Sequence, residues 1–111
     1  QIEGGVVMGI GSALHEEMVV DATGKVRNPS FLDYHLATSL DIPELISIVV
    51  ECAEPEGPYG AKGLGEPGLA PTPAAIGNAV ADAIGVRIYD LPLKPENVYW
   101  AMQKHKKKTA A

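Results

Sequence analysis

A glycine-rich loop holds the residues of this sequence that are best suited to chemistry. Residues 57–68 read GPYGAKGLGEPG, and their single carboxylate, Glu66, stands between Gly65 and Pro67. Glycines permit backbone conformations that bring N–H groups close to a ligand. A carboxylate held on a rigid loop and partly removed from water can act as a general base. The same residues are also typical of a solvated turn in which the glycines only permit bends, so the loop alone leaves both interpretations open.

Two predicted helices flank this loop and would have to position it. Apolar residues recur at every fourth position of residues 2–18, which predicts one face of a helix. Four glycines lie inside this stretch, and each costs a solvent-exposed helix about 1 kcal/mol relative to alanine. We therefore expect these glycines to pack closely against another backbone or a ligand. A second helix is predicted from Thr72 as N-cap and Pro73 as first helical residue to a stop at Gly85.

Three other stretches favour β-structure. Residues 18–28 predict a hairpin that turns at Gly24. Residues 45–52, LISIVVEC, give the strongest strand prediction, because they are short, rich in β-branched residues and almost continuously apolar. Such a run indicates a strand with both faces covered. Residues 86–91 predict a further strand, and Pro95 opens a terminal helix.

Composition and charge exclude several classes of protein. The 111 residues fit one domain, long enough to bury roughly two thirds of its unfolded surface. The formal net charge is −5, and four of the nine basic residues lie in residues 104–111, where we expect a basic disordered tail. The acidic body argues against nucleic-acid binding. A single cysteine, Cys52, excludes a disulfide framework and suits a reducing compartment. No apolar run approaches the roughly 18 residues of a membrane span.

The order and spacing of several motifs resemble a known family. QIEGG at residues 1–5 with GIG at 9–11, and YGAKGLGEP at 59–67 with PTPAAIGNA at 71–79, carry the resemblance, together with GVR, LP and PE near the end. Over residues 1–103 the chain resembles the C-terminal portion of the molybdopterin-binding large subunit of the molybdenum hydroxylases, the family of xanthine dehydrogenase and aldehyde oxidase. The resemblance implies an α+β fold, with a small mixed β-sheet and packed helices.

The resemblance also implies roles for three residues. Glu66 matches the active-site glutamate, which lies beside the molybdenum without ligating it. It accepts a proton as a water-derived oxygen attacks an electrophilic substrate carbon. Gly65 matches a backbone contact close to the metal. Gln1 matches a glutamine that hydrogen-bonds the molybdopterin-type cofactor, a task that suits an amide because it both donates and accepts. No residue of this chain is expected to ligate the metal.

The implied function is part of a cytoplasmic oxidoreductase that hydroxylates an aldehyde or N-heteroaromatic carbon. We expect this chain to be inactive alone, with the remainder of the large subunit, iron–sulfur and FAD components and a small-molecule substrate as partners. Nucleic acid and membrane are not expected partners. The alternative is a non-catalytic α+β interaction or ligand-binding module derived from the same fold. The presence of both Glu66 and Gln1 favours the enzyme, since a disused site has no chemical reason to keep both.

Overall fold

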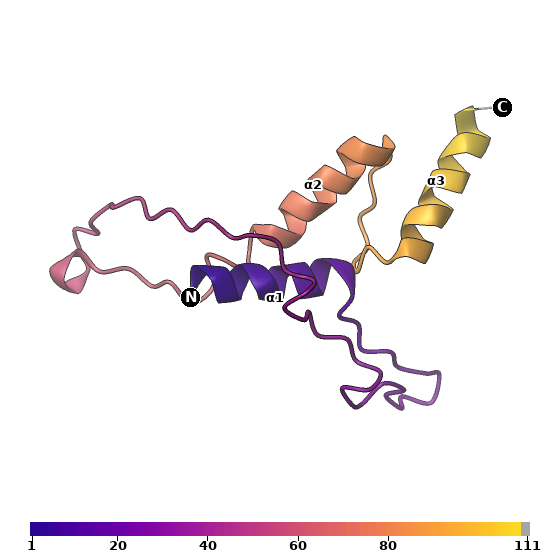
Figure 1. Cartoon of the computed structure of the whole chain (residues 1–111), viewed down its shortest axis with the longest axis horizontal. Helices are drawn as coiled ribbons and strands as arrows, with labels where there is room; N and C mark the ends of the chain where they lie inside the picture. The colour runs from indigo at the N-terminus through magenta and orange to yellow at the C-terminus, as the bar shows by residue number, and fades with distance from the viewer. Residues whose placement is uncertain (110–111) are drawn as a thin grey trace.

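The computed structural model describes residues 1–109, which form three α-helices joined by long irregular segments (Figure 1). The helices are α1 (Ile2–Leu14), α2 (Thr72–Ile84) and α3 (Pro95–Thr109), and a short 3₁₀ helix, η1 (Pro58–Gly60), lies in the glycine-rich loop. Within residues 1–109 there is no strand, and only an isolated antiparallel bridge joins Val20 to Val26. The prediction of an α+β fold with a small mixed sheet is therefore wrong.

The two apolar stretches predicted as strands fail to form a sheet because no strand lies beside either of them. Residues 45–52 run from the side of α1 toward η1 without regular structure (Figure 1). Ile48 and Val50 are 78% and 85% exposed, and Cys52 is exposed as well. Residues 86–91 are irregular in the same way. The β-propensity of these stretches is real, but a strand needs a neighbouring strand to bond its backbone, and residues 1–109 supply none.

The predicted turn at Gly24 is confirmed. Gly24 has a φ of +82°, and its N–H donates to the carbonyl of Asp21 at 3.0 Å. The Asp21 carboxylate accepts hydrogen bonds from the Thr23 hydroxyl at 2.6 Å and from the N–H groups of Thr23 and Lys25 at 2.8 and 3.1 Å. These hydrogen bonds, the Thr23 hydroxyl first, lower the pKa of Asp21 below its usual 3.8. The turn is thus held by one ionised side chain.

The first two helices form where the sequence predicts them, with small shifts at the ends. Helix α1 ends at Leu14, before Met18, because the N–H groups of His15 and Glu16 both turn back to the Gly11 carbonyl, at 3.0 and 2.8 Å. Helix α2 begins at Thr72 and is followed by Gly85, whose φ of +71° is the left-handed conformation that ends helices. The stop predicted at Gly85 is confirmed.

Helix α3 differs from expectation at its end. It continues through the lysines to Thr109, where we expected a disordered tail from residue 104; residues 110–111 of that tail lie outside the described residues. The run QKHKKK contains no glycine or proline to stop a helix. Lys106, Lys107 and Lys108 also place positive charge at the helix end where the backbone dipole is negative.

The described part of the chain is open, with a very small core. Its buried apolar residues are Ile10, Ala13 and Leu93, and the Leu93 N–H donates to the Ala13 carbonyl at 2.6 Å. An ion pair between Lys94 and Glu17 lies beside this contact. The radius of gyration is 18.1 Å, against about 13 Å for a compact domain of this length. The accessible surface is 8650 Å², against about 5,900 Å² for a compact protein of this mass. The chain therefore buries much less surface than its length predicts.

No helix within residues 1–109 is long and apolar enough to cross a membrane.

Candidate functional site

One face of α1 is made of glycines, and it lies directly against the end of the glycine-rich loop. A Cβ atom added at Gly5 would lie 3.0 Å from the Leu69 nitrogen, and one at Gly9 would lie 2.5 Å from the Thr72 Cβ. In return, a Cβ at Gly68 would lie 2.7 Å from the Ile2 carbonyl oxygen. The separations at Gly9 and Gly68 are shorter than real Cβ contacts, and the one at Gly5 is at their lower limit, so the packing favours glycine at all three positions. The predicted close approach is therefore confirmed at Gly5 and Gly9, but not at Gly4, where an added Cβ would meet nothing within 4 Å.

Thr72 completes this contact in a way that the sequence did not predict. Its hydroxyl donates to the Gly68 carbonyl at 2.8 Å, so it closes the loop rather than capping the helix. Its side chain lies over Gly9, where it occupies the space that the missing Cβ leaves. The end of the loop is thereby fixed to α1 through one side chain and several backbone atoms.

The first residue of the chain bonds to the same loop from the other side. The Gln1 side-chain Nε2 donates to the Gly65 carbonyl at 3.0 Å, across 64 positions of sequence. The family resemblance implies that both residues lie at the cofactor, and the structure brings them together. The neighbouring Glu66 has an exposed side chain, and its carbonyl accepts the N–H groups of Leu69 and Ala70, each at 3.0 Å. Its backbone is therefore held in place while its carboxylate meets solvent.

An open hollow of about 280 Å³ adjoins Gln1 and contains a residue that the sequence analysis missed. Its walls are Gln1, Ile2, Glu3, Ser47 and Leu64. Ser47 comes from the stretch predicted as a buried strand, and a hydroxyl in the middle of an apolar run was the signal that could have singled it out. The hollow shows that three segments distant in sequence meet at the N-terminal end of α1.

The residues gathered here suit hydrogen bonding to a cofactor. The Gln1 amide keeps its carbonyl oxygen and one N–H available after bonding to Gly65. A Cβ at Gly63 or Gly65 would meet nothing within 4 Å, so the loop backbone is open to a ligand on that side. Within residues 1–109 no group of three or more His, Cys, Asp or Glu side chains could hold a metal ion. The free groups of the Gln1 amide and the open backbone at Gly63 and Gly65 therefore suit a group that the protein holds by hydrogen bonds.

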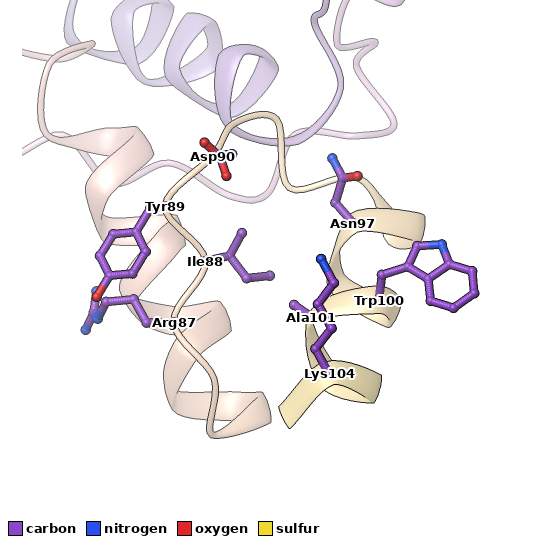
Figure 2. Close-up of a pocket in the computed structure, with 8 residues that line it drawn as sticks. All are labelled: Arg87, Ile88, Tyr89, Asp90, Asn97, Trp100, Ala101 and Lys104. Carbon is purple, nitrogen blue, oxygen red and sulfur yellow. The ribbon is translucent and has the colours of Figure 1, made fainter. Parts of the chain in front are cut away.

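A larger hollow of about 630 Å³ lies elsewhere, between residues 87–90 and α3. Figure 2 shows Ile88 pointing toward α3, whereas Arg87 and Tyr89 point to the opposite side of residues 87–90. Trp100, on α3, points away from residues 87–90. The Arg87 Nη1 is occupied by a 2.8 Å hydrogen bond to Asn78 in α2. None of the three predicted site residues lines this hollow, so we place the candidate site at Gln1, Gly65 and Glu66.

Comparison with known proteins shows the family that this chain resembles. Residues 1–43 match the family of molybdopterin cofactor-binding domains. The chain is 54% identical over 100 residues to the xanthine dehydrogenase molybdenum-binding subunit of Escherichia coli O157:H7, which covers 89% of this chain and 13% of the relative. It is 40% identical over 95 residues to the aldehyde oxidoreductase molybdenum-binding subunit PaoC of Escherichia coli K12, covering 84% of this chain and 13% of the relative.

A solved structure has the same arrangement of helices and loops as this chain. The crystal structure of quinoline 2-oxidoreductase from Pseudomonas putida 86 superposes with a TM-score of 0.84 and 33% identity, over 92% of this chain and 13% of that chain. The open arrangement of helices and loops therefore matches one part of a much longer protein. The chain spans 13% of the length of these relatives. By sequence and by fold, the chain belongs to the xanthine dehydrogenase/aldehyde oxidoreductase family, where it corresponds to a part of the molybdopterin-binding large subunit.

Proposed function

We propose that this chain supplies the general base and one wall of the cofactor site in a molybdenum hydroxylase. The proposed reaction hydroxylates an aldehyde or N-heteroaromatic carbon with oxygen from water. The observation that carries the proposal is the 3.0 Å hydrogen bond from Gln1 to Gly65, which ties a predicted cofactor contact to the residue next to Glu66. The names of the relatives support the substrate class, since they include an aldehyde oxidoreductase and a quinoline 2-oxidoreductase.

Each residue has a distinct part in this proposal. When bound, the molybdenum cofactor supplies the redox chemistry. The Gln1 amide binds it by hydrogen bonds, and the bond to Gly65 orients that amide. The Glu66 carboxylate accepts the proton that the attacking oxygen must lose. A base has to be held within hydrogen-bonding reach of that proton. The backbone bonds at the Glu66 carbonyl provide this constraint on the residue.

The remaining partners follow from the incomplete coverage of the relatives. The remainder of the large subunit would supply the other walls of the site, because this chain spans 13% of the relatives. We propose iron–sulfur and FAD components as the route by which electrons leave. In support, both bacterial relatives are named as molybdenum-binding subunits, which implies further subunits beside them.

The test uses a hybrid subunit, defined as the Escherichia coli O157:H7 subunit in which the matching 100 residues are replaced by those of this chain. In the hybrid subunit, Glu66→Gln keeps the side-chain shape and removes the proton acceptor. We expect unchanged molybdenum and pterin content but a loss of xanthine turnover of about 10²-fold or more, the scale of general-base catalysis.

The matched control is Glu56→Gln, the same change at an exposed glutamate shortly before η1, for which we expect turnover like that of the unmutated hybrid subunit. Near-normal turnover of the Glu66→Gln variant at full metal occupancy would contradict the assignment of the base.

A further inference from the structure

The turn that follows Glu66 is closed by hydrogen bonds, and one of them comes from a side chain. The Glu66 carbonyl accepts the N–H groups of Leu69 and Ala70, each at 3.0 Å. The Thr72 hydroxyl donates to the Gly68 carbonyl at 2.8 Å. The chain is therefore tied together from the candidate base to the first residue of α2.

The bond from Thr72 gives the Gly68 carbonyl its partner. Gly68 is half-buried, and no backbone N–H within residues 1–109 bonds to its carbonyl. A carbonyl group that is partly removed from water needs such a donor. The hydroxyl also turns back toward the loop, since α2 has no side-chain cap bond at its start. It therefore serves the turn and not the helix.

Thr72 is itself held rigidly. It stands between Pro71 and Pro73, whose rings fix the backbone on either side of it. Its N–H donates to the Leu69 carbonyl at 3.2 Å. Its side chain lies over α1, where a Cβ added at Gly9 would come within 2.5 Å of the Thr72 Cβ and 2.8 Å of its Cγ2. The hydroxyl therefore reaches the turn from a fixed place at the contact of α1 with α2.

The loop around Glu66 is also held from its other side. The Gln1 amide donates to the Gly65 carbonyl at 3.0 Å, and a Cβ at Gly68 would lie 2.7 Å from a carbonyl oxygen in the first turn of α1. Glu66 thus lies between two side-chain hydrogen bonds to its own loop, one from Gln1 and one from Thr72. Because the Glu66 side chain is exposed, these contacts position its carboxylate through the backbone.

We propose that Thr72 is a positioning residue for the general base. Its hydroxyl holds the turn that fixes the Glu66 backbone, and through it the carboxylate, without touching substrate or cofactor. This role rests on the proposed function of Glu66. Proton transfer to a held base depends on geometry, and a displacement of about 1 Å can lower a rate about 10²-fold.

Two substitutions at this position separate the hydroxyl from the methyl group. Thr72→Val keeps the shape over Gly9 and removes the donor, whereas Thr72→Ser keeps the donor and removes the methyl group. In the hybrid subunit we expect Thr72→Val to lower kcat about tenfold with KM and molybdenum content unchanged, because only the step that uses the base is affected. Thr72→Ser should retain the kcat of the unmutated hybrid subunit. Unchanged kcat in Thr72→Val, or equal losses in both variants, would overturn the proposal.

Amide hydrogen exchange gives a test that does not depend on activity. The N–H groups of Leu69 and Ala70 bond to the Glu66 carbonyl, so their exchange reports on the turn. In the hybrid subunit, Thr72→Val should speed their exchange up to about tenfold, the effect of losing one hydrogen bond. Thr72→Ser should leave it unchanged. Unchanged exchange in Thr72→Val would overturn the proposal. Failure of that variant to fold or to hold molybdenum would overturn it too, because the hydroxyl would then serve the fold as a whole.

A double-mutant cycle separates this proposal from the proposed function. A positioning residue has no effect once its base is removed, so Thr72→Val should cause no further loss of turnover in a Glu66→Gln hybrid subunit. A further loss of about tenfold there would reject the positioning role and retain the base. Loss of turnover in Glu66→Gln with none in Thr72→Val would do the same. Near-normal turnover of Glu66→Gln would instead reject the proposed function, and the role of Thr72 with it.

Discussion

The glycine face of α1 and the apolar residues 45–52 both carry strong sequence signals, yet only the first is satisfied within this chain. Gly5 and Gly9 lie so close to residues 68–72 that a Cβ added at either position would come within 3.0 Å or less of them. Ile46, Ile48 and Val50 are 78–85% exposed within residues 1–109. The contrast between the two regions shows that an apolar or glycine-rich sequence pattern predicts which residues become buried. It does not predict whether the covering residues lie in the same chain. The part of the site that this chain completes alone is the contact between α1 and the loop.

The largest change in stability is expected where the glycine face is filled. Gly9→Leu would place a side chain where the Thr72 Cβ lies 2.5 Å from the added Cβ. Overpacking of this kind costs up to about 3 kcal/mol. We expect the free energy of local opening of α1, measured by amide exchange in the hybrid subunit, to fall by that amount.

Gly4→Ala is the control for this change, because nothing lies within 4 Å of a Cβ at Gly4. It should leave the opening of α1 unchanged or make it slightly rarer. Slower exchange of α1 in Gly9→Leu would show that its glycine face is not packed, and the contrast with residues 45–52 would disappear.

A good part of the candidate site could be predicted from sequence because its signals are local. Glycine spacing gave the close packing of α1, Gly85 gave the end of α2, and the loop around Glu66 stood out by its composition. The hydrogen bond between Gln1 and Gly65, which are 64 positions apart, was not predicted; the family resemblance placed each residue near the cofactor without pairing them. The roles of Gln1, Gly65 and Glu66 remain predictions.

The sheet was not predictable because strand formation depends on partners that residues 1–109 do not contain. The β-branched composition of residues 45–52 predicted a buried strand with neighbours in the chain, whereas the segment has no regular structure and its apolar side chains are exposed. The place of Ser47 beside Gln1 was hidden for the same reason, because a residue inside an assumed buried strand is not examined as a site residue. The predicted end of helix α3 was too early because its lysines were interpreted as a solvated tail. Lysine is a good helix former, and the helix continues to Thr109.

A smaller effect of opposite sign is expected at Gly77, inside α2. Nothing lies within 4 Å of a Cβ at this position, so alanine fits without displacement. Alanine is favoured over glycine in an exposed helix by up to about 1 kcal/mol. Gly77→Ala in the 111-residue chain should therefore slow the exchange of α2 amides. Faster exchange of α2 would mean that Gly77 is closely packed, as Gly9 is. The distinction between the packed glycines of α1 and the open glycine of α2 would then be lost.

The smallest effect concerns the Asp21 turn, which is part of neither region and so should respond independently of both. Hydrogen bonds from Thr23 and Lys25 lower the pKa of Asp21 in the folded chain below 3.8, its value in an unfolded chain. A group with a lowered folded pKa stabilises the fold above its unfolded value, and this contribution is lost as the pH falls through the folded pKa. The amide protons of Thr23 and Lys25, followed by NMR in the 111-residue chain from pH 6 to about pH 2, should therefore shift only at the acidic end. Asp21→Asn should remove that titration while leaving the amides of α1 in place. A simultaneous loss of the α1 signals with the Asp21 transition would show that the turn and the glycine face unfold as one unit, and that the contact between α1 and residues 68–72 does not stand alone.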